Sequence, residues 1–136
     1  MTNVDKLRRA YQMWFETRGK STAVWLEMLA PDVVLQSLAS GDPAMKFSAT
    51  RRGRIEAEQY FAELAEQWEM LEFHAEEFIA ERDRVVMLGR CAWRFRATGK
   101  TVESPIAHIW RFHNGQAIEF FEFYDTARAF AAAVPD

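Results

Sequence analysis

The chain has 136 residues, which is enough for one domain with a single buried core. Its formal net charge is −3, so its charge gives no reason to expect nucleic acid or an anionic membrane as a partner. We find no N-terminal signal segment, no apolar run of membrane-spanning length and only one cysteine, Cys91. One cysteine cannot form an intrachain disulfide, and we therefore expect a single domain, residues 1–136, in the cytoplasm.

Helices are predicted in the first part of the chain, because apolar residues recur there at spacings of three and four. The first run of this kind is Val4, Leu7, Tyr11 and Trp14. Gly19 is expected to end that helix, and Ser21 is expected to cap a second one that stops at Pro31 and Asp32. The run that predicts the third helix is Ala57, Phe61, Leu64, Trp68 and Leu71.

Strands are predicted beyond residue 72, where the apolar period changes from about 3.6 to about 2. The four predicted strands are Phe73–Ala80, Val85–Ala97, Val102–Phe112 and Ala117–Tyr124. Asn114-Gly115, between the last two, is the strongest short hairpin signal in the chain. We also expect an early strand at Val33–Leu38, a long loop over residues 40–53 and a closing helix at Thr126–Val134.

These elements predict an α+β fold in which N-terminal helices pack on a strongly curved antiparallel sheet. Aromatic residues make up 14% of the chain, a surplus that indicates a ring-lined pocket or interface. Both faces of the sheet are apolar: Ile106 and Trp110 lie on one, Ala107 and Ile109 on the other. Since the helices cover only one face, we expect a homodimer through the sheet.

Several local motifs accompany this order of elements: Gly53-x-Ile55, Tyr60-Phe61, His108-x-Trp110-x-Phe112, Gly115 and Tyr124-Asp125. Together they resemble the nuclear transport factor 2-like superfamily, and within it the SnoaL-like polyketide cyclases and ketosteroid isomerase-like proteins. The likeness covers nearly the whole chain and identifies the superfamily better than the reaction. It implies a cystatin-like cone that binds a small apolar molecule, such as a polyketide or terpenoid intermediate.

His108 is the first candidate for chemistry, because it is the only polar residue on an otherwise apolar strand face. Imidazole titrates near neutrality and can donate or accept a proton at working pH. The resemblance places this position near the family's pocket. The alternative is a core histidine whose nitrogens are hydrogen-bonded to the backbone.

Asp125 is the second candidate, and its role is implied by the resemblance. In SnoaL-like cyclases an aspartate at the end of this strand acts as acid and base. Apolar surroundings would raise the pKa of such a carboxyl group toward neutrality. The alternative is that Asp125 caps the closing helix, which begins at Thr126.

Whether His108 and Asp125 share a face depends on the hairpin turn. A two-residue turn at Asn114-Gly115 pairs His113 with Gln116 and places both candidates on one face. A three-residue turn shifts the register by one residue and separates them, because a one-residue slip moves every side chain to the other face.

Arg90 is the third candidate, through a resemblance to limonene-type epoxide hydrolases. Their pattern is Arg-x-Asp, but this chain has Ala92 at the third position, which argues against that reaction. The alternative for Arg90 is an exposed charge on a strand. Steroid isomerisation is also disfavoured, because Ser37 and Ala107 occupy the positions of its catalytic aspartates.

Two functions therefore remain open. The chain is either a cofactor-free isomerase, cyclase or related lyase in which His108 and Asp125 move protons, or a non-catalytic dimeric module for ligand binding or assembly. We find no metal-ligand spacing and expect no cofactor. The expected substrate-binding residues are Trp14, Phe61, Trp68, Arg90, Trp110 and Tyr124.

Overall fold

The computed structural model describes residues 1–136. Its helices and strands are α1 (Asn3–Glu16), α2 (Thr22–Met28), β1 (Leu29–Ser37), the 3-10 helix η1 (Pro43–Ser48), β2 (Arg51–Arg52), α3 (Gly53–Gln67), β3 (Trp68–Glu81), β4 (Arg84–Phe95), β5 (Thr101–His113), β6 (Gln116–Phe123) and α4 (Thr126–Ala133). None of the helices is long and apolar enough to span a membrane.

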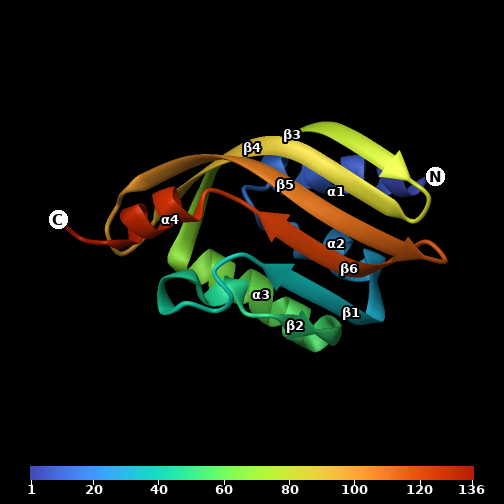
Figure 1. The fold of residues 1–136 in the computed structure, drawn as a ribbon, viewed down its shortest axis with the longest axis horizontal. Coiled ribbons are helices and arrows are strands. Elements are labelled where there is room, and N and C mark those ends of the chain that lie inside the picture. The colour runs from blue at the N-terminus through green and yellow to red at the C-terminus, as the bar shows by residue number, and fades with distance from the viewer.

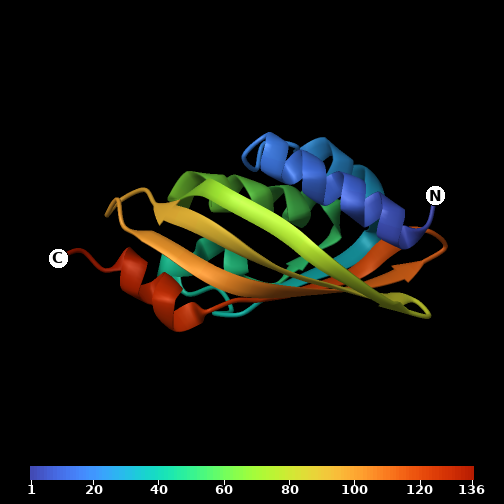
Figure 2. The same ribbon diagram turned by 90° about the horizontal axis from the view of Figure 1, so that it is seen from above.

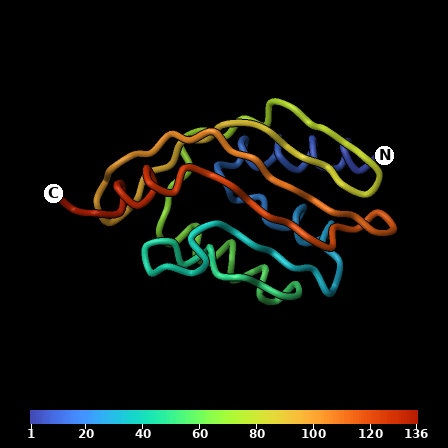
Figure 3. The backbone as a smooth tube through the Cα atoms, viewed as in Figure 1, coloured from blue at the N-terminus to red at the C-terminus, as the bar shows by residue number.

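The six strands form one curved sheet in the order β2-β1-β6-β5-β4-β3 (Figure 1). Strands β3 to β6 form an antiparallel meander, which Figure 3 traces as three successive reversals of the chain. The sheet is mixed, however, because β1 runs parallel to β6. This corrects the expected all-antiparallel sheet: the helices and strands between β1 and β6 form the long connection that a parallel pair needs.

Helices α1, α2 and α3 lie on one side of the sheet, and α4 lies near its far end beside the C-terminus (Figure 2). Helix α1 packs on β3, α3 packs on β1, and α4 contacts β4 and β5. The apolar face of each helix is buried against the inner face of the sheet in one continuous core. The predicted α+β architecture of helices on a curved sheet is therefore confirmed.

Several predicted boundaries were wrong. Helix α2 ends at Met28, and Pro31 and Asp32 lie in β1, where the pairing with β6 is irregular and a missing N–H is tolerated. Helix α3 ends at Gln67, so Trp68 belongs to β3. Trp68 and Leu71 fit a helical spacing, but buried Trp68 and Met70 already alternate as in a strand. The predicted loop contains η1 and β2.

The connection between α1 and α2 contains one confirmed signal and one that was wrong. Gly19 has φ 80°, and its N–H donates to the Trp14 carbonyl at 2.8 Å, which closes the end of α1. Ser21 does precede α2, but its side chain makes no capping hydrogen bond.

The β5–β6 hairpin carries a bulge that sets which side chains face inward. The hairpin predicted at Asn114-Gly115 is confirmed, and of the two turn lengths that the sequence left open it has the two-residue one, with φ 50° and 78° and His113 paired with Gln116. The register then shifts: Phe112 pairs with Ala117, but Arg111 pairs with Glu119. Ile118 is therefore an extra residue on β6, and the rest of that strand is turned over relative to a regular hairpin.

Gly89 of β4 gives a test of the packing between β3 and β4. A Cβ atom at this position would lie 2.0 Å from the carbonyl oxygen of His74, whereas one at Gly99 would meet nothing within 4 Å. We expect Gly89→Ala to lower the free energy of unfolding by about 3 kcal/mol or more. Gly99→Ala, strained only by its φ of 74°, should cost about 1 kcal/mol. Urea denaturation of the two variants measures this, and equal losses would contradict the close strand approach.

Candidate functional site

A cavity of about 110 Å³ lies between the helices and the inner face of the sheet. Of the 24 residues that line it, 20 are hydrophobic, and most of these are aromatic or large aliphatic side chains. The remaining four are Ser104, His108, Glu122 and Asp125. An apolar cavity with a few converging polar groups is the usual form of a small-molecule site.

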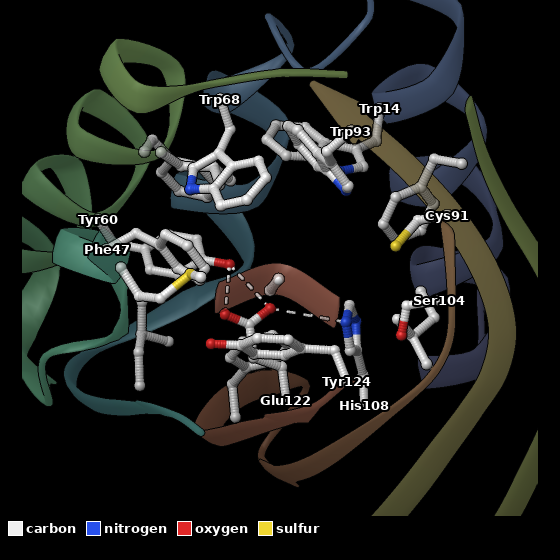
Figure 4. A pocket seen from close by; sticks show the side chains of 18 of the residues that line it. Trp14, Phe47, Tyr60, Trp68, Cys91, Trp93, Ser104, His108, Glu122 and Tyr124 are labelled. Carbon is white, nitrogen blue, oxygen red and sulfur yellow. Dashed lines mark hydrogen bonds and ion pairs between the residues drawn. The ribbon is translucent and has the colours of Figure 1, made fainter. Parts of the chain in front are cut away.

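Glu122 of β6 is the centre of the polar groups in this cavity (Figure 4). The hydroxyl group of Tyr60, on α3, donates to both carboxylate oxygens at 3.0 Å. On the other side, His108 Nε2 lies 3.7 Å from Glu122 Oε2. The side chains of His108 and Glu122 are only 8% and 10% exposed, so solvent screens this pair little.

Burial raises the pKa of Glu122 from its ordinary value of 4.5 to about 7. Hydrogen bonds from Ser37 and Tyr60 to the carboxylate oppose this rise but do not cancel it. A carboxyl group with a pKa near 7 exchanges its proton readily at neutral pH. Glu122 therefore has the protonation behaviour of a general acid or base.

His108 of β5 is held by a buried chain of hydrogen bonds. Its Nδ1 lies 2.6 Å from the hydroxyl oxygen of Tyr11, on α1. That oxygen in turn accepts a hydrogen bond from the indole N–H of Trp110 at 2.9 Å. Burial lowers the pKa of His108 to about 3, so its imidazole ring is neutral at neutral pH.

The bulge at Ile118 decides which carboxylate meets His108. In a regular two-residue hairpin, His108 and Asp125 would share a face, as one alternative from the sequence required. With the extra residue, His108 pairs with Glu122, and both point inward. The sequence left open whether His108 and Asp125 share a face. The turn has two residues, but the bulge shifts the register by one residue and places His108 and Asp125 on opposite faces.

Asp125 follows β6 and lines the cavity, but its carboxylate is engaged elsewhere. One oxygen accepts from the backbone N–H of Arg128 at 3.0 Å, and the other lies 3.2 Å from the Arg128 Nε. The backbone N–H of Asp125 donates to the hydroxyl group of Ser104 at 2.8 Å. These contacts are those of an N-cap for α4.

The aromatic residues expected to bind substrate all line the cavity: Trp14, Phe61, Trp68, Trp110 and Tyr124. Arg90 does not, and this prediction is corrected. Its side chain is 56% exposed on the outer face of β4 and lies 3.8 Å from Glu72 and 3.6 Å from Glu76. Successive strand residues point to opposite faces, so Arg90 points outward whereas Cys91 lines the cavity.

Sequence reasoning missed Tyr11 and Tyr60 as polar members of the site and left Glu122 undecided between the pocket and an interface. Both tyrosines occur at helical spacings that indicate only a buried face. Glu122 lies between Phe121 and Phe123, so either strand face can be the inner one. No group of three or more His, Cys, Asp or Glu side chains is arranged to hold a metal ion.

The fold agrees with comparisons to known proteins. The model of the SnoaL-like domain family matches residues 7–120, and the chain therefore belongs to this family. A search of the curated proteins gives no match. Solved structures with the same fold carry names that include NTF2-like, SnoaL-like polyketide cyclase and ketosteroid isomerase-like.

Three of these structures indicate how similar the chain is. An NTF2-like protein of unknown function from Burkholderia pseudomallei has a TM-score of 0.86 and 26% identity, over 98% of this chain and 99% of the other. A proposed SnoaL-like polyketide cyclase from Jannaschia has a TM-score of 0.79 and 21% identity, over 98% and 93%. TerC, co-crystallised with polyporic acid, has a TM-score of 0.79 and 21% identity, over 96% and 97%.

The raised pKa of Glu122 predicts how the free energy of unfolding depends on pH. Between pH 4.5 and about 7 the folded chain holds a proton on Glu122 that the unfolded chain has lost, so this group destabilises the fold increasingly as pH rises. Glu122→Gln removes that dependence. The unfolding free energy of Glu122→Gln minus that of the original chain should therefore increase by roughly 2–3 kcal/mol from pH 5 to pH 8.

Urea denaturation at both pH values measures this gain. Glu119→Gln is the matched control, because Glu119 lies on the same strand with its side chain 59% exposed. A difference between Glu122→Gln and the original chain that is constant with pH would contradict a raised pKa.

Proposed function

We propose that the chain binds a small apolar, carbonyl-bearing molecule in its cavity and catalyses proton transfer on it without a cofactor. The reaction class is that of an isomerase, cyclase or related lyase on a polyketide- or terpenoid-like substrate. The observation that carries this proposal is Glu122: a carboxyl group with a pKa of about 7, buried among aromatic rings and next to His108. Perturbed titratable groups of this kind cluster at catalytic sites.

The proposed step is proton abstraction next to the carbonyl group. Ionised Glu122 takes a proton from the carbon beside the carbonyl, and the C–H electron pair becomes the carbon–carbon double bond of an enolate. The negative charge then rests on the former carbonyl oxygen, close to neutral His108. Where the enolate is conjugated with a further carbon–carbon double bond, protonated Glu122 returns the proton to the far carbon of that system, which completes an isomerisation. Alternatively, the enolate carbon attacks a second carbonyl group and closes a ring, and the alkoxide formed there takes the proton from Glu122.

The comparisons support the choice of ligand class. TerC, at 21% identity, was co-crystallised with polyporic acid, and other proteins of this fold carry polyketide cyclase or isomerase in their names. The twenty hydrophobic lining residues favour an apolar ligand body. The same lining also suits the alternative function, a carrier or sensor that binds such a molecule without turning it over.

Glu122→Gln distinguishes these functions, because it keeps the shape of the side chain but cannot accept a proton. The assay screens carbonyl-bearing polyketide and terpenoid analogues for binding by calorimetry and for exchange of the hydrogens next to the carbonyl by NMR in D2O. For an enzyme we expect exchange in the original chain, a loss of at least about a hundredfold in Glu122→Gln, and binding in both. Binding without exchange in either protein would identify a carrier.

Asp125→Asn is the control in that assay, since asparagine also caps a helix. Unchanged exchange in this variant is expected if Asp125 is only the cap of α4. A loss as large as that of Glu122→Gln would assign the proton transfer to Asp125, as the family resemblance implies.

We also propose that the chain forms a homodimer through the outer face of its sheet. Apolar side chains of β4, β5 and β6 lie side by side there, as shown by the pairings Val86–Ile109, Leu88–Ala107, Ile109–Phe121 and Ala107–Phe123. Phe121 and Phe123 stack on each other with ring centroids 4.6 Å apart, and Phe123 is 37% exposed. A contiguous, partly exposed apolar face of this kind usually marks an interface.

The dimer predicts twice the chain mass in size-exclusion chromatography with light scattering at micromolar concentration. Phe123→Glu should reduce the mass to that of one chain, because it places a charge in the apolar interface. Ile55→Glu, on α3 and 78% exposed, should leave the mass unchanged. A single-chain mass for the original protein would contradict the proposal.

A further inference from the structure

We propose that Tyr11 fixes His108 in the tautomer that carries its proton on Nε2, and that the gap between His108 and Glu122 is therefore a receptor for one hydroxyl group. The preferred ligand is an apolar ring system with a phenolic or enolic hydroxyl. The inference deepens the function proposed above and, for its catalytic meaning, rests on it. Its structural part, the tautomer, stands on the hydrogen bonds of the unliganded chain.

The tautomer follows from donors and acceptors in the buried chain of Trp110, Tyr11 and His108. The indole N–H of Trp110 can only donate, and it donates to the hydroxyl oxygen of Tyr11 at 2.9 Å. The hydroxyl hydrogen of Tyr11 then has His108 Nδ1 as its acceptor, at 2.6 Å. Nδ1 accepts only when it has no hydrogen, so the proton of the neutral ring is on Nε2.

The opposite arrangement leaves a buried polar group without a partner. If Nδ1 carried the proton, both His108 and Trp110 would donate to the same oxygen, and the hydroxyl hydrogen of Tyr11 would need another acceptor. No other acceptor lies within hydrogen-bond distance of that hydroxyl, and Tyr11 is only 3% exposed. A buried donor without an acceptor costs about 1–3 kcal/mol, which selects the tautomer with its proton on Nε2.

The protonated Nε2 faces Glu122 across a gap that the two side chains do not close themselves. At 3.7 Å, Nε2 and Oε2 are too far apart for a good hydrogen bond. One oxygen atom can lie within hydrogen-bond distance of both, because two bonds of about 2.8 Å easily span such a gap. That oxygen has to accept from His108 and donate to Glu122, and a hydroxyl group does both.

This arrangement also defines what happens to the hydroxyl proton. Glu122, when ionised, takes the proton, and the oxygen keeps the electron pair of the O–H bond as an oxyanion that still accepts from His108 Nε2. A ligand with a methyl group in place of the hydroxyl occupies the same space, but it leaves the His108 Nε2–H without an acceptor and Glu122 with only its contacts to Tyr60. Such a mismatch in a buried site is strongly unfavourable, so the site selects for the hydroxyl.

The tautomer is tested by two-bond nitrogen–proton NMR of the imidazole rings in ¹⁵N-labelled unliganded protein at neutral pH. We expect His108 to show an unprotonated Nδ1 and a protonated Nε2. Tyr11→Phe removes the donor to Nδ1 and should give a mixture of tautomers. Tyr60→Phe, which removes a hydroxyl from Glu122 but not from His108, should keep the original tautomer. His74→Gln and His113→Gln assign the remaining imidazole signals.

The receptor is tested with 2-naphthol and its near-isostere 2-methylnaphthalene, whose binding is followed by quenching of tryptophan fluorescence. We expect 2-naphthol to bind at least about tenfold more tightly, which corresponds to about 1.4 kcal/mol. In Tyr11→Phe this ratio should fall toward one while 2-methylnaphthalene keeps its affinity, because the cavity remains but the fixed donor is lost.

The outcomes separate this inference from the proposed function. A protonated Nδ1 in the original chain overturns the tautomer and leaves Glu122 as the proposed base. The expected tautomer with equal affinity for the two naphthalenes overturns the hydroxyl receptor. Failure of both probes to bind contradicts an accessible apolar cavity, and with it the proposed function.

Discussion

The burial of one carboxyl group, that of Glu122, is the constraint on which the arrangement of the cavity depends. Taking a carboxylate from water into apolar surroundings is costly unless a positive charge compensates it. Here the neighbours are Tyr60, a hydroxyl donor, and His108, which is neutral, so the pKa of Glu122 rises to about 7. That rise corresponds to about 3 kcal/mol at high pH, a sizeable part of the 5–15 kcal/mol that stabilise a typical domain. A cost of this size without structural benefit is typical of functional groups.

The bulge at Ile118 makes this burial possible. Without the extra residue, Glu122 would point to the outer face of the sheet, and Phe121 would take its place opposite His108. With it, Glu122 lies beside His108 and Tyr60 in the cavity, while Phe121 and Phe123 form the apolar outer face. A single inserted residue therefore determines both the pair inside the sheet that is proposed for proton transfer and the outer surface proposed for the dimer, because strand side chains alternate between the faces.

Much of the fold was predictable from the sequence, and the exact site was not. Strands β4 to β6 and the Asn114-Gly115 turn follow from alternation and turn chemistry, which are local properties. The end of α3 was missed because Trp68 satisfies both the helical and the strand spacing. The bulge was missed because β6 is apolar on both faces, so the sequence gives no preference for either register. The partner of His108 depended on that register, and a local pattern could not identify it.

Ser37 and Ala107 occupy the positions of the catalytic aspartates of steroid isomerisation, and the structure changes what these two replacements imply about catalysis. From the sequence, Ser37 and Ala107 in place of aspartates argued against steroid isomerisation. In the structure Ser37 pairs with Glu122 on the neighbouring strand, so the carboxylate occupies the next strand instead of being absent. Ala107 lies on the outer face, and the adjacent His108 points into the cavity. Proton transfer needs a group of suitable pKa within reach of the substrate, and its position in the chain is irrelevant. The absence of those aspartates therefore does not weigh against catalysis.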